Sequence, residues 1–536
     1  MSRDRTVQPR RLASSVIRAG ALATLACALA AAAPVHAQGS GSPLDSLAAR
    51  IDPYVAKARL LVLTDIANEP DDQMSLVRLL VYSNRVDIEG LVATTSTWMR
   101  RAVRPDVIRT VLDAYEQVQP NLLKHEKGFP TAAALRAVVT TGQPGYGMEA
   151  VGEGKTSPGA ELIIRAADRN DPRPLWVTAW GGANTLAQAL TQVRATRTPA
   201  EVDRFVAKLR VYAISDQDDA GRWIRREFPT LHYINIPSTQ DGAEYYLATW
   251  TGISGDRFYR NAPGADFTTF SDAWVDANIR KKGPLGAHYP RPCCIHEGDT
   301  PAFLGLIDGG LASAMSPTFG GWGGRYVWRR FTGETRPHWT QGGDSYPGND
   351  ASRDAVVGTD GKTYVSDQAT IWRWREDFQH DFAARMAWTV EPYEKANHNP
   401  VVIVNGRAGD EPLQLSAKVG VPVMLDASGT KDPDGNALRY DWFFYQEAGR
   451  GIPGHPVANR RLAPAGAAPP GAGNIPSAPV DGPPQPPPRV TIEGATSARA
   501  TVTPRVAGVS HVILAVRDNG APTLTSYRRI ILTIAP

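Results

Sequence analysis

Four acidic side chains gather within eight residues near the start of the chain: Asp65, Glu69, Asp71 and Asp72. They directly follow the continuous apolar run 59–64, which is typical of a buried parallel strand. In an open α/β sheet, ligands bind at the carboxyl ends of the strands. Carboxylates this close repel one another and need a counter-cation at neutral pH, and oxygen ligands suit Ca²⁺ or Mg²⁺. The alternative is a solvated acidic loop that caps a helix, although capping requires only one acid.

The elements that must position these acids alternate between strands and helices from about residue 44 to 395. Apolar runs predict strands at 59–64, 87–94, 174–180, 209–215 and 231–237, and helical periodicity predicts helices at 71–83, 183–194, 220–228 and 368–388. This alternation predicts an α/β fold with a Rossmann-like, mostly parallel sheet and helices on both faces. The pattern weakens between residues 255 and 361, where glycine, proline and aromatic residues dominate.

The last region, residues 396–536, loses the helical periodicity. Short alternating runs predict strands at 422–425, 438–444, 500–504, 510–517 and 526–534, as in an all-β immunoglobulin-like sandwich. Residues 453–488 contain 12 prolines and are expected to form an insertion outside the core. The sequence Asp432-Pro433-Asp434-Gly435 is first of all a turn, with a second Ca²⁺ site formed together with Asp426 as the alternative.

The first 37 residues have the features of a secretory signal peptide. Arginines precede an Ala- and Leu-rich run at 19–34, and Val35-His36-Ala37 supplies small residues for cleavage. An N-terminal membrane anchor is the alternative, but the run is shorter than the roughly 20 residues that a membrane span needs. We therefore expect an exported protein, periplasmic or extracellular, with a short linker at 38–43 and no membrane span in the mature chain.

The leader also accounts for the formal net charge of +4, so the mature chain is neutral. A neutral chain lacks the excess of lysine and arginine on which sequence-independent nucleic-acid binding depends, so we expect no nucleic-acid partner. Only Cys293 and Cys294 remain in the mature chain, which excludes a disulfide scaffold. Adjacent cysteines either bridge through a strained ring or remain as two buried thiols.

Three segments, in order along residues 59–310, resemble nucleoside hydrolases of the inosine–uridine-preferring type. Asp71-Asp72 matches the aspartate pair of that family, and Asp65 matches one of the aspartates before it. Residues 180–187 resemble the family's strand–helix turn, and residues 296–302 resemble its late His/Asp segment. The resemblance implies a nucleoside hydrolase-like domain that binds Ca²⁺ through Asp65, Asp71, Asp72, the backbone at Asn184, and Asp299. Glu297 competes with Asp299 for the late ligand position.

A narrower resemblance points to secreted bacterial proteins that join such a domain to a C-terminal β-sandwich, some of them described as cellulose-binding. It rests on the segments 68–72, 215–219, 297–301 and 320–325. The segments 425–435 and 440–442 resemble PKD and cadherin-like sandwich repeats.

Hydrolysis at an anomeric carbon passes through an oxocarbenium-like state and requires a proton acceptor for the attacking water. We expect Asp65 as the base and His296 as the acid for the leaving group, with a hydrogen-bonded core histidine as the alternative for His296. Trp322 lies between glycine pairs and is expected to offer an exposed ring for stacking on a sugar. The full set of expected substrate contacts is Asn68, Glu69, Thr95, Trp98, Asp216, Asp218, Glu297 and Trp322, although Asp216 and Asp218 could equally cap the next helix.

These features favour an exported, Ca²⁺-dependent glycosidic hydrolase that acts on the N- or O-glycosyl bond of a nucleoside or of a sugar derived from a polysaccharide. The alternative is a non-catalytic protein that binds cellulose or another polysaccharide on a hydrolase-like fold. Two departures from the hydrolase family favour this alternative. The loop 66–70 is altered, and residues 94–97 stand where the family has a sugar-binding asparagine.

Overall fold

The computed structural model describes residues 43–238, 242, 245–255, 259, 263–331, 333–341, 352–450 and 488–536. The expected signal peptide, nearly all of the linker and nearly all of the proline-rich segment 453–488 lie outside these residues. No helix in the described ranges is long and apolar enough to cross a membrane.

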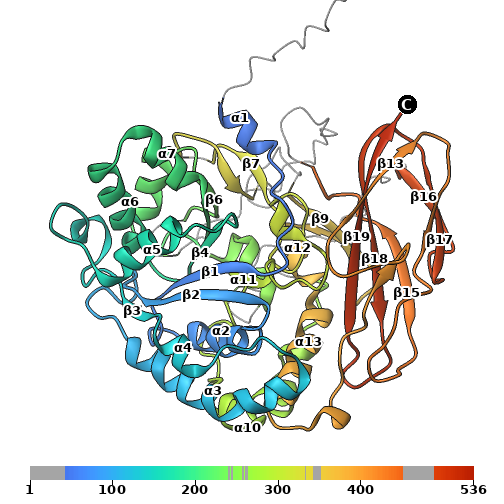
Figure 1. Cartoon of the computed structure of the whole chain (residues 1–536), viewed down its shortest axis with the longest axis horizontal. Helices are drawn as coiled ribbons and strands as arrows, with labels where there is room; N and C mark the ends of the chain where they lie inside the picture. Colours follow the sequence, from blue (N-terminus) through green and yellow to red (C-terminus); the bar gives the residue numbers. More distant parts are fainter. Residues whose placement is uncertain are drawn as a thin grey trace, which may run out of the picture. The chain divides into compact units, whose positions relative to one another are not determined.

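An eight-stranded sheet is the centre of the α/β region (Figure 1), with strand order β3-β2-β1-β4-β5-β6-β8-β7. All neighbours pair in parallel except the edge strand β7, which is antiparallel to β8. The predicted mostly parallel sheet is confirmed. The chain moves outward from β1 on both sides, so the topological switch point lies between β1 and β4. The strands are β1 (Ala58–Thr64), β2 (Val86–Ala93), β3 (Val139–Thr141), β4 (Leu175–Ala179), β5 (Leu209–Ala213), β6 (His232–Asn235), β7 (Val327–Arg329) and β8 (His338–Thr340).

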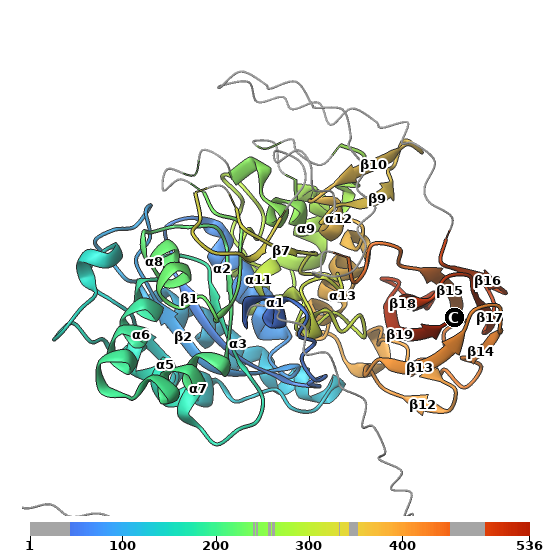
Figure 2. The same cartoon turned by 90° about the horizontal axis from the view of Figure 1, so that it is seen from above.

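Helices cover both faces of this sheet (Figure 2) because the side chains of each strand alternate between two cores. Leu60 and Val62 of β1 belong to the core that includes α2 (Pro70–Val81), α3 (Pro105–His125) and α13 (Arg375–Ala387). Leu61 and Leu63 belong to the core of α5 (Pro158–Asp168), α6 (Asn184–Thr196), α7 (Pro199–Ala207) and α8 (Ala220–Glu227). The shorter helices are α1 (Pro43–Ala48), α4 (Ala132–Arg136), α9 (Asp272–Val275), α10 (Gly283–Ala287), α11 (Pro301–Leu304) and α12 (Ala369–Trp372).

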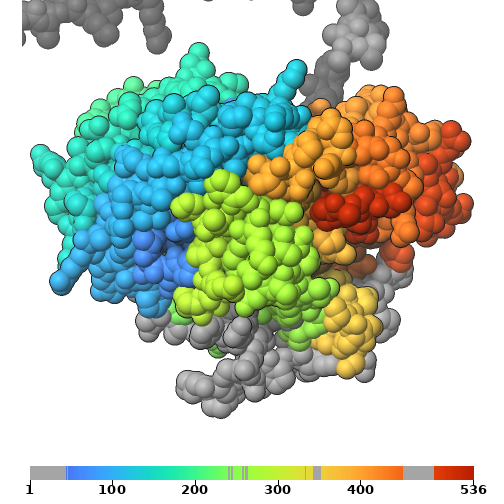
Figure 3. Space-filling view, turned by 90° about the horizontal axis from the view of Figure 1, so that it is seen from below, coloured from blue at the N-terminus to red at the C-terminus, as the bar shows by residue number. Residues whose placement is uncertain are grey.

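The region from residue 255 to 361, where the sequence pattern is weak, forms short elements rather than long helices. Within it, α10 packs against α3, and in Figure 3 this yellow-green segment adjoins the light-blue surface. A small hairpin of β9 (Asp354–Val357) and β10 (Thr363–Ser366) closes the region. The single helix expected at 368–388 is in fact two, α12 and α13. The backbone departs from helical geometry at Trp374, whose buried ring packs against Tyr445 and Tyr527 of the C-terminal region.

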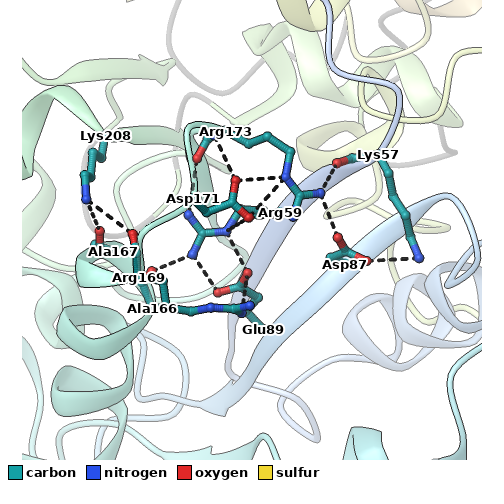
Figure 4. A network of polar contacts seen from close by, with 10 residues as sticks. All are labelled: Lys57, Arg59, Asp87, Glu89, Ala166, Ala167, Arg169, Asp171, Arg173 and Lys208. Carbon is teal, nitrogen blue, oxygen red and sulfur yellow. Dashed lines mark hydrogen bonds and ion pairs between the residues drawn. The ribbon is translucent and has the colours of Figure 1, made fainter.

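Paired charges occupy the end of the sheet at which the central strands begin (Figure 4). Arg59, at the start of β1, binds both carboxylate oxygens of Glu89, at 2.6 and 2.9 Å. Arg173, just before β4, binds Asp87 and Asp171, each at 2.7 Å. The acids at this end therefore have cationic partners, whereas no ion pair within the described part of the chain involves the acids at the carboxyl end of β1.

The C-terminal region forms two main sheets around its own apolar core, as the sequence predicts, and a small two-stranded sheet of β11 and β12. One sheet has the order β13-β19-β18-β15 and the other β14-β17-β16; β13 pairs in parallel with β19, and the other pairs are antiparallel. Trp442, Val502 and Leu514 lie in the core between them. The strands are β11 (Ile403–Val404), β12 (Arg407–Ala408), β13 (Leu413–Lys418), β14 (Val423–Asp426), β15 (Arg439–Phe444), β16 (Val490–Glu493), β17 (Arg499–Pro504), β18 (Gly508–Arg517) and β19 (Thr525–Ala535).

The acidic turn of this region has a structural role. The Asp432 carboxylate accepts hydrogen bonds from the backbone N–H groups of Asp434 and Asn436, both at 2.9 Å. The Asp434 carboxylate contacts the ring of His398 at 2.9 Å. These bonds are those of a turn, and among the described acids only the cluster at the carboxyl end of β1 converges as a cation site would require.

Buried polar contacts join β19 to the α/β region. The carboxylate of Asp377 in α13 accepts hydrogen bonds from the hydroxyl groups of Thr525, at 2.8 Å, and Tyr527. The guanidinium of Arg529, also buried, donates to the backbone carbonyl groups of Leu311 and Gly320. The sandwich therefore packs against the segment that follows Asp299. The expected domain boundary at 395–396 stays a prediction.

Candidate functional site

The candidate site lies at the carboxyl end of β1, beside the switch point of the sheet. Asp65 directly follows β1, and Asp71 and Asp72 occupy the first turn of α2, where the helix dipole favours negative charge. Gly181 follows the neighbouring strand β4. A Cβ atom at that position would come within 2.7 Å of an Asp65 carboxylate oxygen, so only glycine fits against this acid without displacing it.

Three carboxylates converge at this point. Asp71, Asp72 and Asp299 each place one oxygen within 4.8 Å of the other two, and all three residues are buried. Thr64 donates a hydrogen bond to Asp72, whereas Oδ2 of Asp299 is buried without a hydrogen-bond partner. A Cβ atom at residue 298, which is glycine, would approach an Asp71 oxygen to 2.6 Å. The chain thus brings acidic oxygens together and leaves one of them without a donor.

Burial and mutual repulsion disfavour the charged forms of these acids. Burial raises the pKa of Asp65 to about 6, although hydrogen bonds with Ser96 and Asp72 oppose the rise. Burial, and after it the charges of neighbouring carboxylates, raise the pKa of Asp71, Asp72 and Asp299 well above the usual value. Without a cation, the cluster therefore favours uptake of protons, and a bound divalent cation would favour the ionised forms instead.

The acids form one wall of a cavity of about 250 Å³, the acid cavity. Aromatic rings form much of the rest: Tyr245 and Trp250 are buried, and Trp98 is 44% exposed. The indole N–H of Trp250 donates to the Ser215 hydroxyl at 3.0 Å, which fixes this ring. The described lining residues are Asp65, Asn68, Glu69, Asp71, Asp72, Trp98, Ile214, Gln217, Gly242, Tyr245, Trp250, Tyr259, Cys294, Ile295 and Asp299.

Seven of the residues singled out from the sequence meet in this cavity: Asp65, Asn68, Glu69, Asp71, Asp72, Trp98 and Asp299. The other seven do not line it, and His296, Asn184 and Thr95 are the first three of them. The His296 ring packs edge-on against Phe270, with centroids 5.4 Å apart. The side chain of Asn184 donates to the carbonyl of Gly145 at 2.8 Å, and the Thr95 hydroxyl donates to the same carbonyl at 3.1 Å. His296 and Thr95 are thus not among the described lining residues, and the roles expected for them, like the backbone contact expected at Asn184, stay predictions.

Glu297 is neither a cation ligand nor a substrate contact. It is fully buried and forms a two-point ion pair with Arg78 of α2. The hydroxyl groups of Tyr289 and Thr300 also donate to its carboxylate, at 2.7 and 2.9 Å. These partners satisfy both oxygens, so Asp299 is the acid of this segment that faces the cavity.

Asp216 and Asp218 stabilise the framework instead of lining the cavity. Both oxygens of Asp216 bind the buried Arg225 at 2.8 Å, and Arg225 also binds Glu334. The Asp218 carboxylate accepts hydrogen bonds, each of 3.0 Å, from the backbone N–H groups of Ala220 at the start of α8 and Asn184 at the start of α6. The helix-capping alternative is therefore correct for Asp218, and an ion pair accounts for Asp216.

Trp322 is a core residue. It is 1% exposed and packs against Phe378 and Tyr527, with ring centroids 6.2 and 6.4 Å apart. Its glycine neighbours suggested an exposed ring, but β19 covers it. The two cysteines are free thiols, as one of the two alternatives expected, but they are not buried: Cys293 is exposed, and the half-buried Cys294 lines the acid cavity.

Sequence reasoning missed several cavity residues. Gln217 lies within the segment 215–219 that the sequence analysis had marked for its aspartates, and its side chain donates to the carbonyl of Trp180. Tyr245 and Trp250 lie in short 3₁₀ turns without apolar periodicity, so no pattern indicated them, and none indicated Tyr259.

A larger cavity, of about 610 Å³, does not have comparable chemistry. Glu126 and Asp381 are among its lining acids, and both bind Arg385, at 3.3 and 3.2 Å. The Tyr82 hydroxyl also donates to Asp381. These acids are neutralised within the protein, so the acid cavity is the stronger candidate.

Comparisons with known proteins identify related sequences and one related structure. Residues 59–326 match the family model described as cellulose-binding Sde182, nucleoside hydrolase-like domain, and residues 422–534 match the cellulose-binding protein Sde0182, C-terminal domain. A solved nucleoside hydrolase-related protein from Saccharophagus degradans, described as associated with carbohydrate metabolism, is 36% identical. That match covers 89% of this chain and 100% of the other, with a TM-score of 0.70.

Two further structural matches are too weak to support a conclusion about this chain. The type III effector XopQ, solved with adenosine diphosphate ribose, is 12% identical over 65% of this chain and 100% of its own, with a TM-score of 0.29. The PKD domain of the KIAA 1837 protein is 20% identical over 23% of this chain and 85% of its own, with a TM-score of 0.13. No curated protein matches the chain. From the two family models and the Saccharophagus structure, we conclude that the chain belongs to the Sde182 family of cellulose-binding proteins with a nucleoside hydrolase-like domain.

Proposed function

We propose that the protein is an exported hydrolase that uses Ca²⁺ in the acid cavity to cleave the glycosidic bond of a sugar derived from a polysaccharide or of a nucleoside. The observation that carries this proposal is the convergence of three buried carboxylates within 4.8 Å in an aromatic-lined cavity. The family description and the carbohydrate association of the Saccharophagus relative favour the saccharide over the nucleoside. Export rests on the signal-like residues 1–37.

The donor set fits a hard divalent cation. Asp71, Asp72 and Asp299 would supply its protein oxygens, and the unpartnered Oδ2 of Asp299 is the atom that most needs one. Ca²⁺ bound there would balance two of the negative charges of the cluster and make a coordinated water more acidic. The protein's own contribution is to hold the three acids on α2 and on the segment before α11, with glycines where a side chain would intrude.

Asp65 is the proposed base. Burial raises its pKa to about 6, which leaves it ionised at neutral pH and able to take a proton from water. Hydrogen bonds with Ser96 and Asp72 hold it beside the converging acids. Glu69, whose pKa is raised first by burial and then by the charge of Asp65, is the proposed proton donor to the leaving group, since a carboxyl with a raised pKa can serve as an acid.

A binding protein without catalysis is the second candidate. The observation that favours it is the position of His296, which packs against Phe270 outside the described cavity lining. If Glu69 does not protonate the leaving group, the site has a base but no leaving-group acid, and it would retain the sugar without cleaving it. The aromatic walls would serve either function.

The two functions are separated by measuring binding and turnover on the same samples. Cellulose pull-down reports binding, and release of reducing sugar or free base from a panel of neutral glycosides and nucleosides reports turnover. The hydrolase proposal expects turnover that disappears with EGTA and falls at least a hundredfold in Asp65→Asn, in line with the usual effect of removing a general base. Asp203→Asn, at an exposed position on α7, is the control. Binding without turnover of any glycoside would establish the second candidate.

A further inference from the structure

The acid cavity has a one-sided charge. Five of its described lining residues are carboxylic acids, Asp65, Glu69, Asp71, Asp72 and Asp299, and no lysine, arginine or histidine is among the described lining residues. One divalent cation could balance at most two negative charges. An anionic group entering this cavity would therefore meet an excess of negative charge in a partly buried site, where screening by salt is weak.

Arginines of neighbouring elements are already committed to other acids. Arg78 on α2 is fully buried and holds Glu297, and Arg225 on α8 is buried and holds Asp216 and Glu334. Moving either guanidinium toward a substrate would leave a buried carboxylate without its partner, which is strongly destabilising. These arginines cannot serve a phosphate or carboxylate in the cavity.

Trp98 borders both the cavity and solvent. It lines the cavity while 44% of its surface is exposed. Its backbone N–H donates to the Ser96 hydroxyl at 3.0 Å, and its ring makes an edge contact with Tyr245 at a centroid distance of 6.4 Å. Gly242, at φ +68°, lets the chain pass close to the indole, where a Cβ atom would lie 3.1 Å from the ring. The ring is therefore held in place before any ligand arrives, as a stacking surface at the entrance.

We infer that the acid cavity selects a neutral terminal unit of its substrate, stacks the neighbouring unit on Trp98, and rejects substrates that carry a carboxylate or phosphate on the enclosed unit. This inference rests on the proposed function, because it assigns the substrate class of the same cavity. A volume of about 250 Å³ suits a single enclosed unit, so the protein would bind a chain at its end.

Binding to the Ca²⁺-supplemented full chain, measured by calorimetry, tests the inference with two matched pairs. Cellobiose is compared with cellobiouronic acid, in which the terminal C6 hydroxymethyl group is a carboxylate, and inosine is compared with inosine 5′-phosphate. Within the pair that binds, we expect the neutral member to bind at least tenfold more tightly than the charged member. Most of this difference should persist at high salt, because salt screens a partly buried site only weakly. Equal or tighter binding of the charged member overturns this inference but leaves the proposed function standing. Binding of neither pair contradicts the proposed function and the inference together.

The role of Trp98 is tested by comparing cellobiose with glucose in Trp98→Ala. We expect a three- to tenfold loss for cellobiose and little change for glucose, because only the second unit reaches the ring. Trp98→Phe should recover most of the affinity for cellobiose, and Trp328→Ala, on the edge strand β7, is the control for a tryptophan outside the cavity. An equal loss for both sugars would mean that Trp98 does not contact the second unit.

Discussion

Replacing Asp299 by asparagine removes one charge from the acid cluster and nearly preserves the shape of the side chain. An oxygen of Asp299 lies within 4.8 Å of oxygens on Asp71 and Asp72. At that separation and an effective dielectric constant of about 20, Coulomb's law gives roughly 3 kcal/mol of repulsion for each pair of unit charges. The raised pKa values of the three acids mean that protons relieve part of this repulsion when no cation is present. We expect the metal-free Asp299→Asn variant to be more stable than the native protein by about 1–2 kcal/mol.

Scanning calorimetry in EGTA should report this difference as a rise of a few degrees in melting temperature. Added Ca²⁺ should reverse the order. The native protein gains about 2.7 kcal/mol at a hundredfold excess over Kd, whereas the variant has lost one of three ligands and gains less. Asp203→Asn should behave like the native protein under both conditions. The reasoning is refuted if metal-free Asp299→Asn melts below the native protein and keeps the full gain with Ca²⁺.

Four further predictions concern stability. Without Ca²⁺, the free energy of unfolding should fall by at least about 3 kcal/mol as pH rises from about 4 to above 6. The folded protein holds the Asp65 proton to a pKa of about 6, whereas the unfolded chain releases it near 3.8, and the raised pKa values of Asp71, Asp72 and Asp299 add to the fall. Urea titrations at several pH values should show this slope, and it should be shallower in Asp65→Asn. Glu297→Gln should lower the free energy of unfolding by about 3–5 kcal/mol, since Arg78 loses its buried partner, while the Ca²⁺ affinity of the folded protein stays unchanged in calorimetric titration. Trp322→Ala should lower the free energy of unfolding by about 3–5 kcal/mol, measured by urea titration. The affinity of the folded protein for cellobiose should stay unchanged. Deleting residues 396–536 should leave the α/β region less stable and prone to aggregation, which light scattering would detect. A monomeric fragment with a native melting temperature would show that the contacts made by β19 do not stabilise the α/β region.

The position of the acid cluster could be predicted from the sequence because it depends on local features. The run 59–64 is too apolar to be exposed, and its strand is followed at once by Asp65 and by the acids of α2. The carboxyl end of a central parallel strand is where such folds bind ligands. Asp299 was the one distant member that could be anticipated, through the resemblance of its segment to a known family.

The remaining assignments depend on partners far away in the chain. Glu297 and Asp299 are two residues apart and chemically similar, and only the buried Arg78, 219 residues earlier, decides that Glu297 turns away from the cavity. The glycines around Trp322 suggested exposure, but Tyr527, contributed by the C-terminal sandwich, covers the ring. Local sequence does not encode such tertiary contacts, so these two residues were misassigned.

The central claim is that the acid cavity binds a cation, and calorimetric titration of Ca²⁺ into chelator-treated protein tests it most directly. The account predicts one Ca²⁺ per native chain and none in an Asp71→Asn, Asp72→Asn double variant that remains folded by circular dichroism, with Asp203→Asn indistinguishable from the native protein. No binding to the native protein, or equal binding to the double variant, would contradict it.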